Sequence, residues 1–197
     1  MSSILPYDKL DPRVQRTIDI LYDAFQVLLK DKHYKFIKVQ EIVEKAHLNR
    51  ATFYLHFENK RDFIYFCVRD GFRRELGERL SDPNFSYNAM NLKLFIGWTL
   101  RYIDKTYSLW NYQWEEILFE SGTRDAIHYF LLNWIKMQDD PTIYSPTVIN
   151  TCSMVLSSAI TGLGLMWCHN GCKESVDLLT DQITDLFIGG LPCLYDR

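Results

Sequence analysis

Residues 39–63 read VQEIVEKAHLNRATFYLHFENKRDF, and the local fold follows from the pattern within them. Apolar residues recur one helical turn apart at two places in this stretch, which predicts short helices over about 39–46 and 50–57. Only a few residues remain between the two helices, so the chain must turn sharply there. The pattern is typical of two short helices held at a fixed angle.

The turn between these helices carries its own capping signals. Asn49 can act as an N-cap and accept a hydrogen bond from the backbone N–H of Thr52. Leu48 and Phe53 can form a hydrophobic staple across the start of the second helix. His47 lies where such turns often need a positive φ, which histidine tolerates better than β-branched residues do. We therefore assign His47 a structural role in the turn.

Helical periodicity continues on both sides of this unit. Apolar residues at spacings of three and four predict a helix over about 12–30, which Pro12 is well placed to open. Another helix is predicted from about Lys60 to Leu80, with Asn59 as its N-cap, and it should link the two halves of the chain. Two helices around a tight turn, with a supporting helix before them, can lay one helix in the major groove of DNA.

The rest of the chain is also predicted to be helical. No segment alternates convincingly as a strand, and turn residues divide the sequence beyond residue 80 into five helical stretches. These stretches cover about 88–105, 109–119, 124–137, 146–168 and 174–188. We therefore expect an all-α chain of about nine helices.

Composition and charge limit the kinds of partner that the chain can have. Of its 197 residues, 47% are apolar and 15% are aromatic, which is enough to bury a core. The net charge of −3 excludes an overall positive field, but residues 1–79 carry +3 and residues 80–197 carry −6. No secretory signal is recognisable, and the five scattered cysteines suit reduced thiols, so we expect a cytoplasmic protein.

The outer side of the predicted helix 50–57 carries hydrogen-bond donors and small apolar groups. Because Phe53 and Phe57 must point to the core, the outer side is left to the remaining residues. These are Arg50, Ala51, Thr52, Tyr54, Leu55 and His56. Arginine can bind guanine through two hydrogen bonds, hydroxyl groups can reach phosphates, and small apolar groups can contact the thymine methyl. The alternative is ordinary solvent exposure.

Arg50 and Lys60 lie in the first turns of predicted helices, and Lys38 lies at the start of the helix predicted over 39–46. A cation there interacts unfavourably with the helix dipole, at a cost of roughly a few tenths of a kcal/mol. A bound phosphate would reverse the sign of this interaction, because helix N-termini attract anions. The placement therefore favours contacts with a nucleic-acid backbone.

The motif TFYxHFxxK at residues 52–60 resembles the helix-turn-helix of the TetR family of transcriptional regulators, and the resemblance extends over about residues 13–66. It implies contacts to DNA, chiefly to the backbone, from the residues at positions 50, 52, 54, 56 and 60. Together with the residues considered above, the predicted DNA-binding set is Lys38, Gln40, Arg50, Ala51, Thr52, Tyr54, Leu55, His56 and Lys60.

The same resemblance implies two domains and a function. A three-helix helix-turn-helix DNA-binding domain would occupy residues 1–62, and a helical effector-binding and dimerisation domain would occupy residues 63–197. A homodimer would bind a palindromic operator in double-stranded DNA, with its two recognition helices about 34 Å apart. The protein would act as a repressor whose operator affinity is changed by a small-molecule effector.

The second half of the chain is rich in aromatic residues, most of which should fill its core. Flat side chains together with methionines can also line an adaptable apolar cavity. The resemblance places a small apolar or aromatic effector among them. Our candidate pocket residues are Trp98, Tyr102, Trp114, Phe119, Phe130, Trp134 and Met154.

Residues 141–172 carry no charged side chain. This stretch is long enough for a transmembrane helix, but its polar residues and the lack of flanking basic residues favour a helix buried between protein surfaces, without a membrane. Gly162 and Gly164 suggest that another helix approaches closely, which a second subunit would supply. The predicted dimer interface comprises Leu156, Ala159, Ile160, Gly162, Leu163, Trp167, Leu179, Ile183 and Leu186.

Two weaker patterns suggest an enzyme. The sequence Cys168-His169-x-x-Cys172 can hold a metal or activate a thiolate, but it lacks a clear fourth ligand. A second set, with one Asp-x-x-His pattern, lacks the paired motifs of carboxylate-bridged metal proteins. This second set is Glu116, Glu120, Asp125 and His128. We therefore predict that the protein is not an enzyme and holds neither metal nor cofactor.

A further alternative keeps the DNA-binding domain and changes its control. Some TetR-like regulators, among them the dihydroxyacetone-kinase regulator group, respond to a protein partner and activate transcription. Similar regulators combine a Thr-Phe-Tyr recognition helix with an aromatic C-terminal half. This chain has both features, with the tripeptide at residues 52–54. Control by a protein partner therefore stays open beside control by a small molecule.

Overall fold

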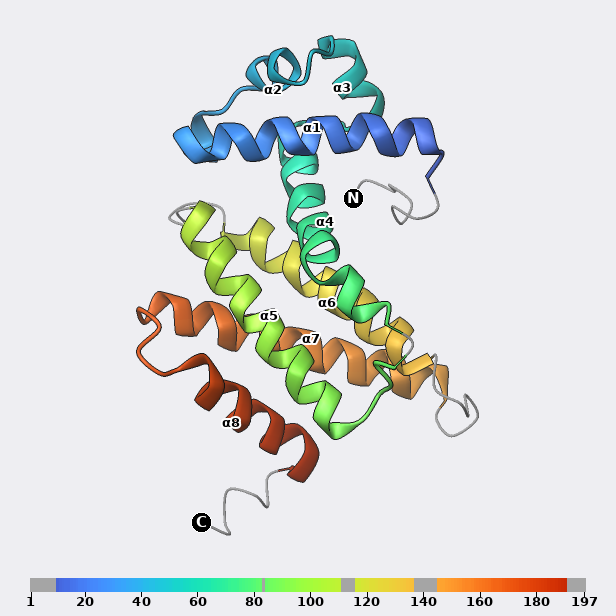
Figure 1. Ribbon diagram of the computed structural model, residues 1–197, viewed down its shortest axis with the longest axis vertical. Coiled ribbons are helices and arrows are strands. Elements are labelled where there is room, and N and C mark those ends of the chain that lie inside the picture. Colours follow the sequence, from blue (N-terminus) through green and yellow to red (C-terminus); the bar gives the residue numbers. More distant parts are fainter. Residues whose placement is uncertain (1–9, 83, 111–115, 137–144, 191–197) are drawn as a thin grey trace.

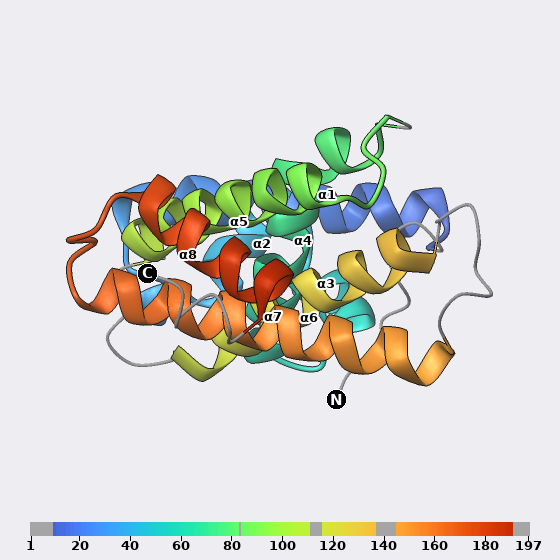
Figure 2. The same cartoon turned by 90° about the horizontal axis from the view of Figure 1, so that it is seen from below.

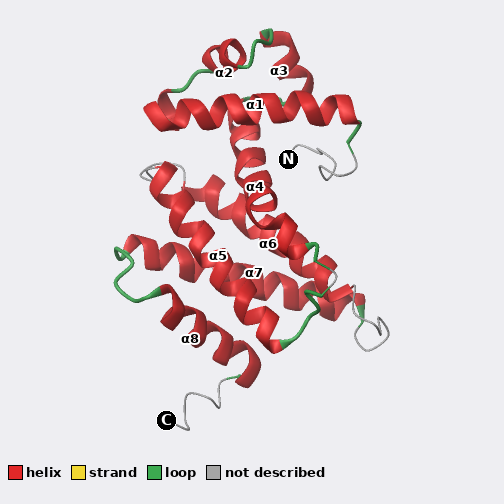
Figure 3. Ribbon diagram, in the orientation of Figure 1, coloured by secondary structure: helices red, strands yellow, loops and turns green. Residues whose placement is uncertain are grey.

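The computed structural model describes residues 10–82, 84–110, 116–136 and 145–190. Within these ranges the chain is helical and contains no strand, so the predicted all-α class is confirmed (Figure 3). The elements are α1 (Pro12–Asp31), the short 3-10 helix η2 (Tyr34–Phe36), α2 (Val39–Lys45), α3 (Arg50–His56), α4 (Lys60–Leu80), α5 (Ala89–Trp110), α6 (Glu116–Lys136), α7 (Pro146–His169) and α8 (Val176–Gly189).

The helices form two groups joined by α4. Helices α1, α2 and α3 gather at one end of the molecule, and α4 leads from them into the group formed by α5 to α8 (Figure 1). Helices α7 and α8 both pack against α5 and lie on the side of the molecule away from α2 and α3 (Figures 1 and 2). The N-terminal unit therefore projects from the C-terminal bundle.

Aromatic side chains close the small N-terminal unit. Four phenylalanines are buried there: Phe25 of α1, Phe53 of α3, Phe57 at the C-cap of α3, and Phe63 of α4. The ring centroids of Phe53 and Phe63 are 5.3 Å apart, and those of Phe57 and Phe63 are 5.0 Å apart. Edge-to-face contacts of this kind add to the stabilisation that burial of the rings provides. The expected inward direction of Phe53 and Phe57 is confirmed.

The turn between α2 and α3 has the predicted geometry. His47 has φ 54°, in the left-handed region that the sequence pattern indicated. Asn49 Oδ1 accepts a hydrogen bond from the backbone N–H of Thr52 at 2.9 Å and so caps α3. Because both features arise between neighbours in the chain, the angle between α2 and α3 is set locally.

The prediction of separate helices over 109–119 and 124–137 is wrong. Helix α5 continues to Trp110, and α6 runs without a break from Glu116 to Lys136. The expected turn around Gly122 lies inside α6, where an added Cβ would be 3.0 Å from Val68 Cγ1 and 3.3 Å from the carbonyl oxygen of Tyr65. This glycine therefore permits close packing of α6 on α4, and it does not end a helix.

Helix α7 contains the long uncharged stretch. By length and composition alone it can cross a membrane, and 44% of its most apolar window is buried inside the protein. At Gly164 an added Cβ would lie 2.8 Å from Ile103 Cδ1 and 3.2 Å from Leu100 Cδ2, both on α5. The prediction that a second subunit approaches Gly164 is therefore wrong, because α5 of the same chain fills the space beside this glycine. At Gly162 the space is open.

Candidate nucleic-acid interface

The outer side of α3 is exposed at the end of the molecule that α2 and α3 form (Figure 1). The side chain of Leu55 is 80% exposed, and that of Tyr54 is 44% exposed. Arg50 and Ala51, in the first turn of α3, are exposed as well. Two bulky apolar or aromatic groups and one cation thus share an accessible helical surface of the size that a DNA major groove admits.

Arg50 and Tyr54 contact each other on this surface. Arg50 Nη2 donates a hydrogen bond to Tyr54 Oη at 3.2 Å, and the guanidinium carbon lies 5.5 Å from the centre of the tyrosine ring. The half-buried Thr52 donates its hydroxyl to Asn49 Oδ1 at 3.2 Å. These contacts order the side chains in advance, which reduces the conformational entropy that is lost when a partner binds.

His56 lies half-buried in the last turn of α3. Burial lowers the pKa of its imidazole below the ordinary value of 6.5, because the cation loses hydration. The ring is therefore mostly neutral at pH 7. In that form one ring nitrogen can donate a hydrogen bond to a phosphate oxygen.

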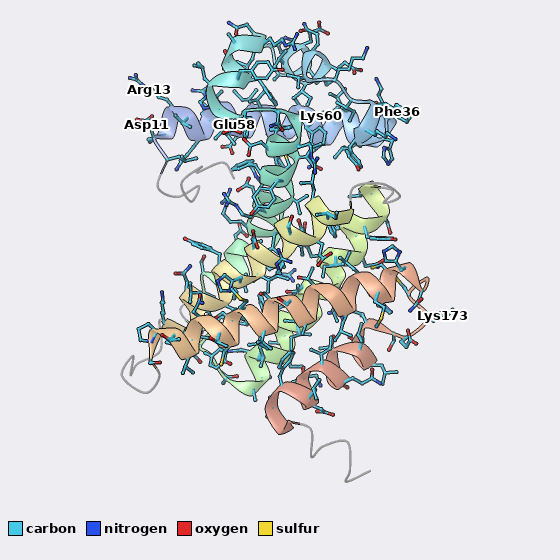
Figure 4. All side chains as sticks on the ribbon, turned by 180° about the vertical axis from the view of Figure 1, so that it is seen from behind. Asp11, Arg13, Phe36, Glu58, Lys60 and Lys173 are labelled. Atoms are coloured by element: carbon cyan, nitrogen blue, oxygen red, sulfur yellow. The ribbon has the colours of Figure 1, made fainter. Side chains whose placement is uncertain are left out.

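Lys60 has a structural partner that the sequence did not indicate. Its Nζ donates hydrogen bonds to the carbonyl oxygens of Tyr34 at 2.6 Å and Lys35 at 3.1 Å. Figure 4 shows Lys60 close to α1, at the level of the segment that carries Phe36. Lys60 therefore ties the start of α4 to η2, which connects α1 to α2. The carbonyl partners are 26 and 25 residues away, so no local pattern could reveal them.

The start of α2 combines exposed polar groups with Glu41, an ionised carboxylate that is paired with a lysine. Lys38 and Gln40 are exposed, and the Gln40 amide donates to Glu44 at 2.7 Å. Glu41 accepts from the backbone N–H of Lys38 at 2.8 Å and pairs with Lys32 Nζ at 2.6 Å. The hydrogen bond from Lys32 is the largest cause of the lowered pKa of Glu41. Pairing with Lys32 reduces the repulsion between Glu41 and a DNA phosphate.

Comparison with known families assigns this part of the chain. Residues 22–64 match the family model for bacterial regulatory proteins of the tetR family. This is the N-terminal helix-turn-helix domain of the TetR family. The match covers the second half of α1, all of α2 and α3 and the first turn of α4, so the TetR-type unit includes the exposed surface described above.

Two relatives of this chain are named as HTH-type transcriptional regulators. The dhaKLM operon transcriptional activator DhaS of Lactococcus lactis is 27% identical over 123 residues, which are 62% of this chain and 59% of DhaS. The HTH-type regulator YxbF of Bacillus subtilis is 39% identical over 62 residues, 31% of this chain and 16% of YxbF. In both cases the match spans less than two thirds of the relative.

A solved regulator shares the fold over most of the chain. The fatty acid degradation regulator FadR from Bacillus halodurans superimposes with a TM-score of 0.52 and 17% sequence identity. The superposition covers 93% of this chain and 98% of that one. The two proteins thus share the arrangement of their helices over most of their length.

In the C-terminal half of the chain, three of the candidate effector residues, Trp98, Phe130 and Trp134, belong to a cluster of aromatic rings. Trp134 stacks on Phe85 with ring centroids 4.9 Å apart, and its indole N–H donates to the Phe85 carbonyl oxygen at 2.6 Å. Trp98 stacks on the same ring at 5.3 Å, and Phe130 stacks on Phe95 at 5.0 Å. These rings pack on one another in the C-terminal half of the chain.

The four other candidates are Tyr102, Trp114, Phe119 and Met154. Phe119 is buried, Met154 is 54% exposed on α7, and Trp114 lies outside the described residues. Tyr102 is buried and donates its hydroxyl to the Val68 carbonyl oxygen at 3.0 Å. Tyr102 also lines a cleft of about 100 Å³ between α1, α4 and α5. Of the candidate residues, Tyr102 is the one that lines this cleft.

The candidate dimer residues fall into a buried, a half-buried and an exposed group. Those buried inside the protomer are Leu156, Ile160, Trp167 and Ile183; those half-buried are Ala159, Leu163 and Leu179; and those exposed are Gly162 and Leu186. The outward side of α7 also carries Val155 and Met166, which are 56% and 55% exposed. The predicted set does not include these two, because it was drawn largely from the more hydrophobic inner side of α7.

The cysteine motif at the end of α7 gains a third member in the structure. The ligand atoms of Asp104, Cys168 and Cys172 all lie within 4.8 Å of one another. Burial is the largest cause of the raised pKa of Cys168, about 12, and the pKa of Cys172 is raised too. These thiols are protonated at neutral pH, which is the opposite of an activated cysteine nucleophile.

The predicted acidic set does not form a metal cluster among the described residues. Asp125 accepts a hydrogen bond from Tyr65 Oη at 2.5 Å, and Arg124 lies 3.7 Å from Glu120. Burial raises the pKa of Tyr65 to about 12, and the hydrogen bond with Asp125 contributes a smaller part of this rise. Asp125 thus stabilises the contact between α4 and α6, and Glu120 pairs with Arg124 within α6. The side chain of Glu116 lies outside the described residues.

Proposed function

We propose that the protein is a cytoplasmic transcriptional regulator that binds a palindromic operator as a homodimer and acts as a repressor. Its DNA-binding domain would comprise residues 1–62, and residues 63–197 would form the effector-binding and dimerisation domain, with α4 crossing the boundary. The observation that carries this proposal is the exposed outer side of α3, preceded by the capped turn at Asn49. No catalytic residue is assigned.

The DNA-binding residues have different roles in this proposal. Arg50, Ala51, Tyr54 and Leu55 are exposed on α3, where a recognition helix meets base edges and nearby phosphates. Thr52 and His56 are half-buried at the border of this surface, which suits contacts to the backbone. Lys38 and Gln40 would contact phosphates from the start of α2, and Lys60 would contribute from α4 while holding η2 in place.

A salt titration with a genomic fragment tests this assignment. A fragment is first selected from genomic DNA by the purified protein, and its affinity is then measured by fluorescence anisotropy at several salt concentrations. Lys38→Ala should weaken binding to all sequences and lower the salt slope by about one, as expected for a lost phosphate contact. Arg50→Ala should change the preferred bases if Arg50 reads the groove.

Lys173→Ala is the matched control for these lysine and arginine variants. Lys173 is exposed in the loop between α7 and α8, far from α2 and α3 (Figure 4). Its replacement removes the same charge and should leave both affinity and salt slope unchanged. Equal losses for Lys38→Ala and Lys173→Ala would show that only the net charge matters, and the assigned surface would then be wrong.

A dimer is supported by the outward side of α7. Val155, Gly162 and Met166 lie along it at spacings of seven and four, so they share one exposed stripe. Leu178 and Ile188 add exposed apolar surface on α8. Exposed apolar surface of this kind is typical of interaction sites. A second copy of α7 and α8 would cover it and place two α3 helices on one DNA duplex.

A small apolar or aromatic effector is supported by polar atoms inside the C-terminal helices. The hydroxyls of Thr99, Thr123 and Thr161 and Nδ1 of His128 are buried without a hydrogen-bond partner among the described residues. A buried polar group that lacks a partner costs about 1–3 kcal/mol, and a ligand's polar groups can satisfy it. The cleft beside Tyr102 is smaller than the roughly 300 Å³ of small ligand pockets, so α1, α4 and α5 would have to separate for an effector to bind in this cleft.

A thermal-shift screen with small aromatic acids and fatty acids tests the effector. A binding compound should raise the melting temperature and lower operator affinity, because it favours one arrangement of the helices over the other. Thr161→Val keeps the shape of the side chain and removes the hydroxyl. It should weaken the compound's binding and leave operator affinity in its absence unchanged. A compound that binds without changing operator affinity would be no effector.

Control by a protein partner is the second candidate function. The observation that favours it is the match to DhaS, which is named as an activator and aligns with this chain over 123 residues. Deletion of the gene should lower expression of the adjacent operon if the protein is an activator, and raise it if the protein is a repressor. A co-purifying protein that strengthens operator binding would support the second candidate.

A further inference from the structure

We propose that Asp104, Cys168 and Cys172 form a binding site for a zinc ion. Cys168 lies in the last turn of α7, Cys172 lies in the loop that follows, and Asp104 lies on α5. Two sulfur ligands and one oxygen ligand are a donor set that zinc accepts, with a water or another group in the fourth position. The proposal does not depend on the transcriptional role proposed above.

The distances suit a tetrahedral ion. Cys172 Sγ donates to Asp104 Oδ1 at 3.5 Å, and all three ligand atoms lie within 4.8 Å of one another. Around a tetrahedral zinc ion, bond lengths of about 2.3 Å to sulfur and 2.0–2.2 Å to oxygen place sulfur and oxygen about 3.5 Å apart and two sulfurs about 3.8 Å apart. Only small side-chain movements are therefore needed to bring the three ligand atoms around one ion.

The backbone holds the two cysteines in place before an ion binds. The N–H of Cys172 donates to the Trp167 carbonyl oxygen at 3.0 Å, and Gly171 takes φ 78° just before it. The indole N–H of Trp167 donates to the Glu174 carbonyl oxygen at 2.9 Å. These two hydrogen bonds hold the loop after α7 against the last turns of that helix. This order reduces the conformational entropy that is lost when the ligands gather around an ion.

Burial and access are both compatible with a metal site. Cys168 is buried, whereas Cys172 and Asp104 are partly exposed, so an ion can enter from one side. Both cysteines are free thiols. Zinc would replace the two thiol protons, which pass to solvent, and the aspartate would supply the third ligand. The ion would link α5 to the loop that leads into α8.

A cobalt titration of the full-length, reduced, metal-free protein tests the site. Cobalt bound by thiolates absorbs in the near ultraviolet, and we expect this absorption to saturate at one cobalt per chain and to disappear when zinc is added. Zinc should also raise the melting temperature, because it binds the folded state. Absence of thiolate absorption in the wild-type protein would overturn the proposal.

Three variants locate the site. Cys172→Ser should lose the thiolate absorption at one equivalent, and Asp104→Asn should weaken zinc binding at least about tenfold, by analogy with altered metal sites. Cys152→Ser is the matched control, because Cys152 is an exposed thiol elsewhere on α7; its absorption and affinity should equal those of the wild type. Circular dichroism confirms that each variant is folded. Unchanged absorption in Cys172→Ser, or an unchanged affinity in folded Asp104→Asn, would refute the assignment.

Discussion

Arg74 of α4 forms an ion pair with Asp19 of α1, and the same guanidinium binds Asp70 on its own helix at 2.5 Å. Asp70 is almost completely buried, so its charge needs cationic partners. Tyr22 of α1 also faces this group, with 4.2 Å between the guanidinium carbon and the ring centre. Arg74 therefore joins the helix that supports the TetR-type domain to the helix that enters the C-terminal bundle.

Replacing Arg74 by alanine should lower the free energy of unfolding by about 2–3 kcal/mol, because it removes a charge-assisted bond to a buried carboxylate. Urea denaturation measures this loss. Arg73→Ala is the matched control, since Arg73 binds the same Asp70 carboxylate at 2.7 Å. A double-mutant cycle between Arg74→Ala and Asp19→Asn should show a coupling energy. Additive effects of the two changes would mean that the contact with α1 contributes nothing.

The half-buried His56 should make stability depend on pH. Its folded-state pKa lies below 6.5, so the unfolded chain binds the proton more readily than the folded chain does. The contribution of neutral His56 is present above about pH 6.5 and is lost as the pH falls from there toward the folded-state pKa. His56→Gln should flatten this part of the stability curve. Denaturation midpoints between pH 5 and 8, compared with those of the exposed-site variant Gln40→Ala, provide the measurement.

Gly122 and Gly162 should respond in opposite ways to alanine. Gly122→Ala brings a Cβ against Val68 and the Tyr65 carbonyl oxygen, so we expect a net loss of about 1–2 kcal/mol in spite of better helix propensity. Gly162→Ala enters open space and should stabilise the protomer by up to about 1 kcal/mol. Thermal unfolding compares the two. A stabilised Gly122→Ala variant would show that α6 does not pack on α4 this closely.

A charge on the outward side of α7 should break the proposed dimer. Met166→Glu places a carboxylate where a second copy would bury it, so sedimentation should show monomers and operator affinity should fall at least about tenfold. Met90→Glu is the control, because Met90 is 74% exposed at the start of α5. It should sediment like the wild type. If Met166→Glu remains dimeric, the dimer uses another surface.

Local patterns were sufficient for the N-terminal unit. The turn between α2 and α3 depends on His47 and on the bond from the Thr52 N–H to Asn49, and all of these lie within six residues. Caps and turns are satisfied by near neighbours, so their residues identify them in the sequence. The inward positions of Phe53 and Phe57 follow from helical periodicity for the same reason.

The sequence by itself determined the helical class, the capped turn and the outward side of α3, because helix periodicity and capping act over three or four residues. Only the tertiary structure decided that Gly122 lies inside a helix and that Gly164 meets α5. It also placed Lys60 on the carbonyl oxygens of η2 and Asp104 beside two cysteines. These contacts join segments 25 to 68 residues apart, and their partners are chosen by how whole helices pack, which no short window of sequence contains.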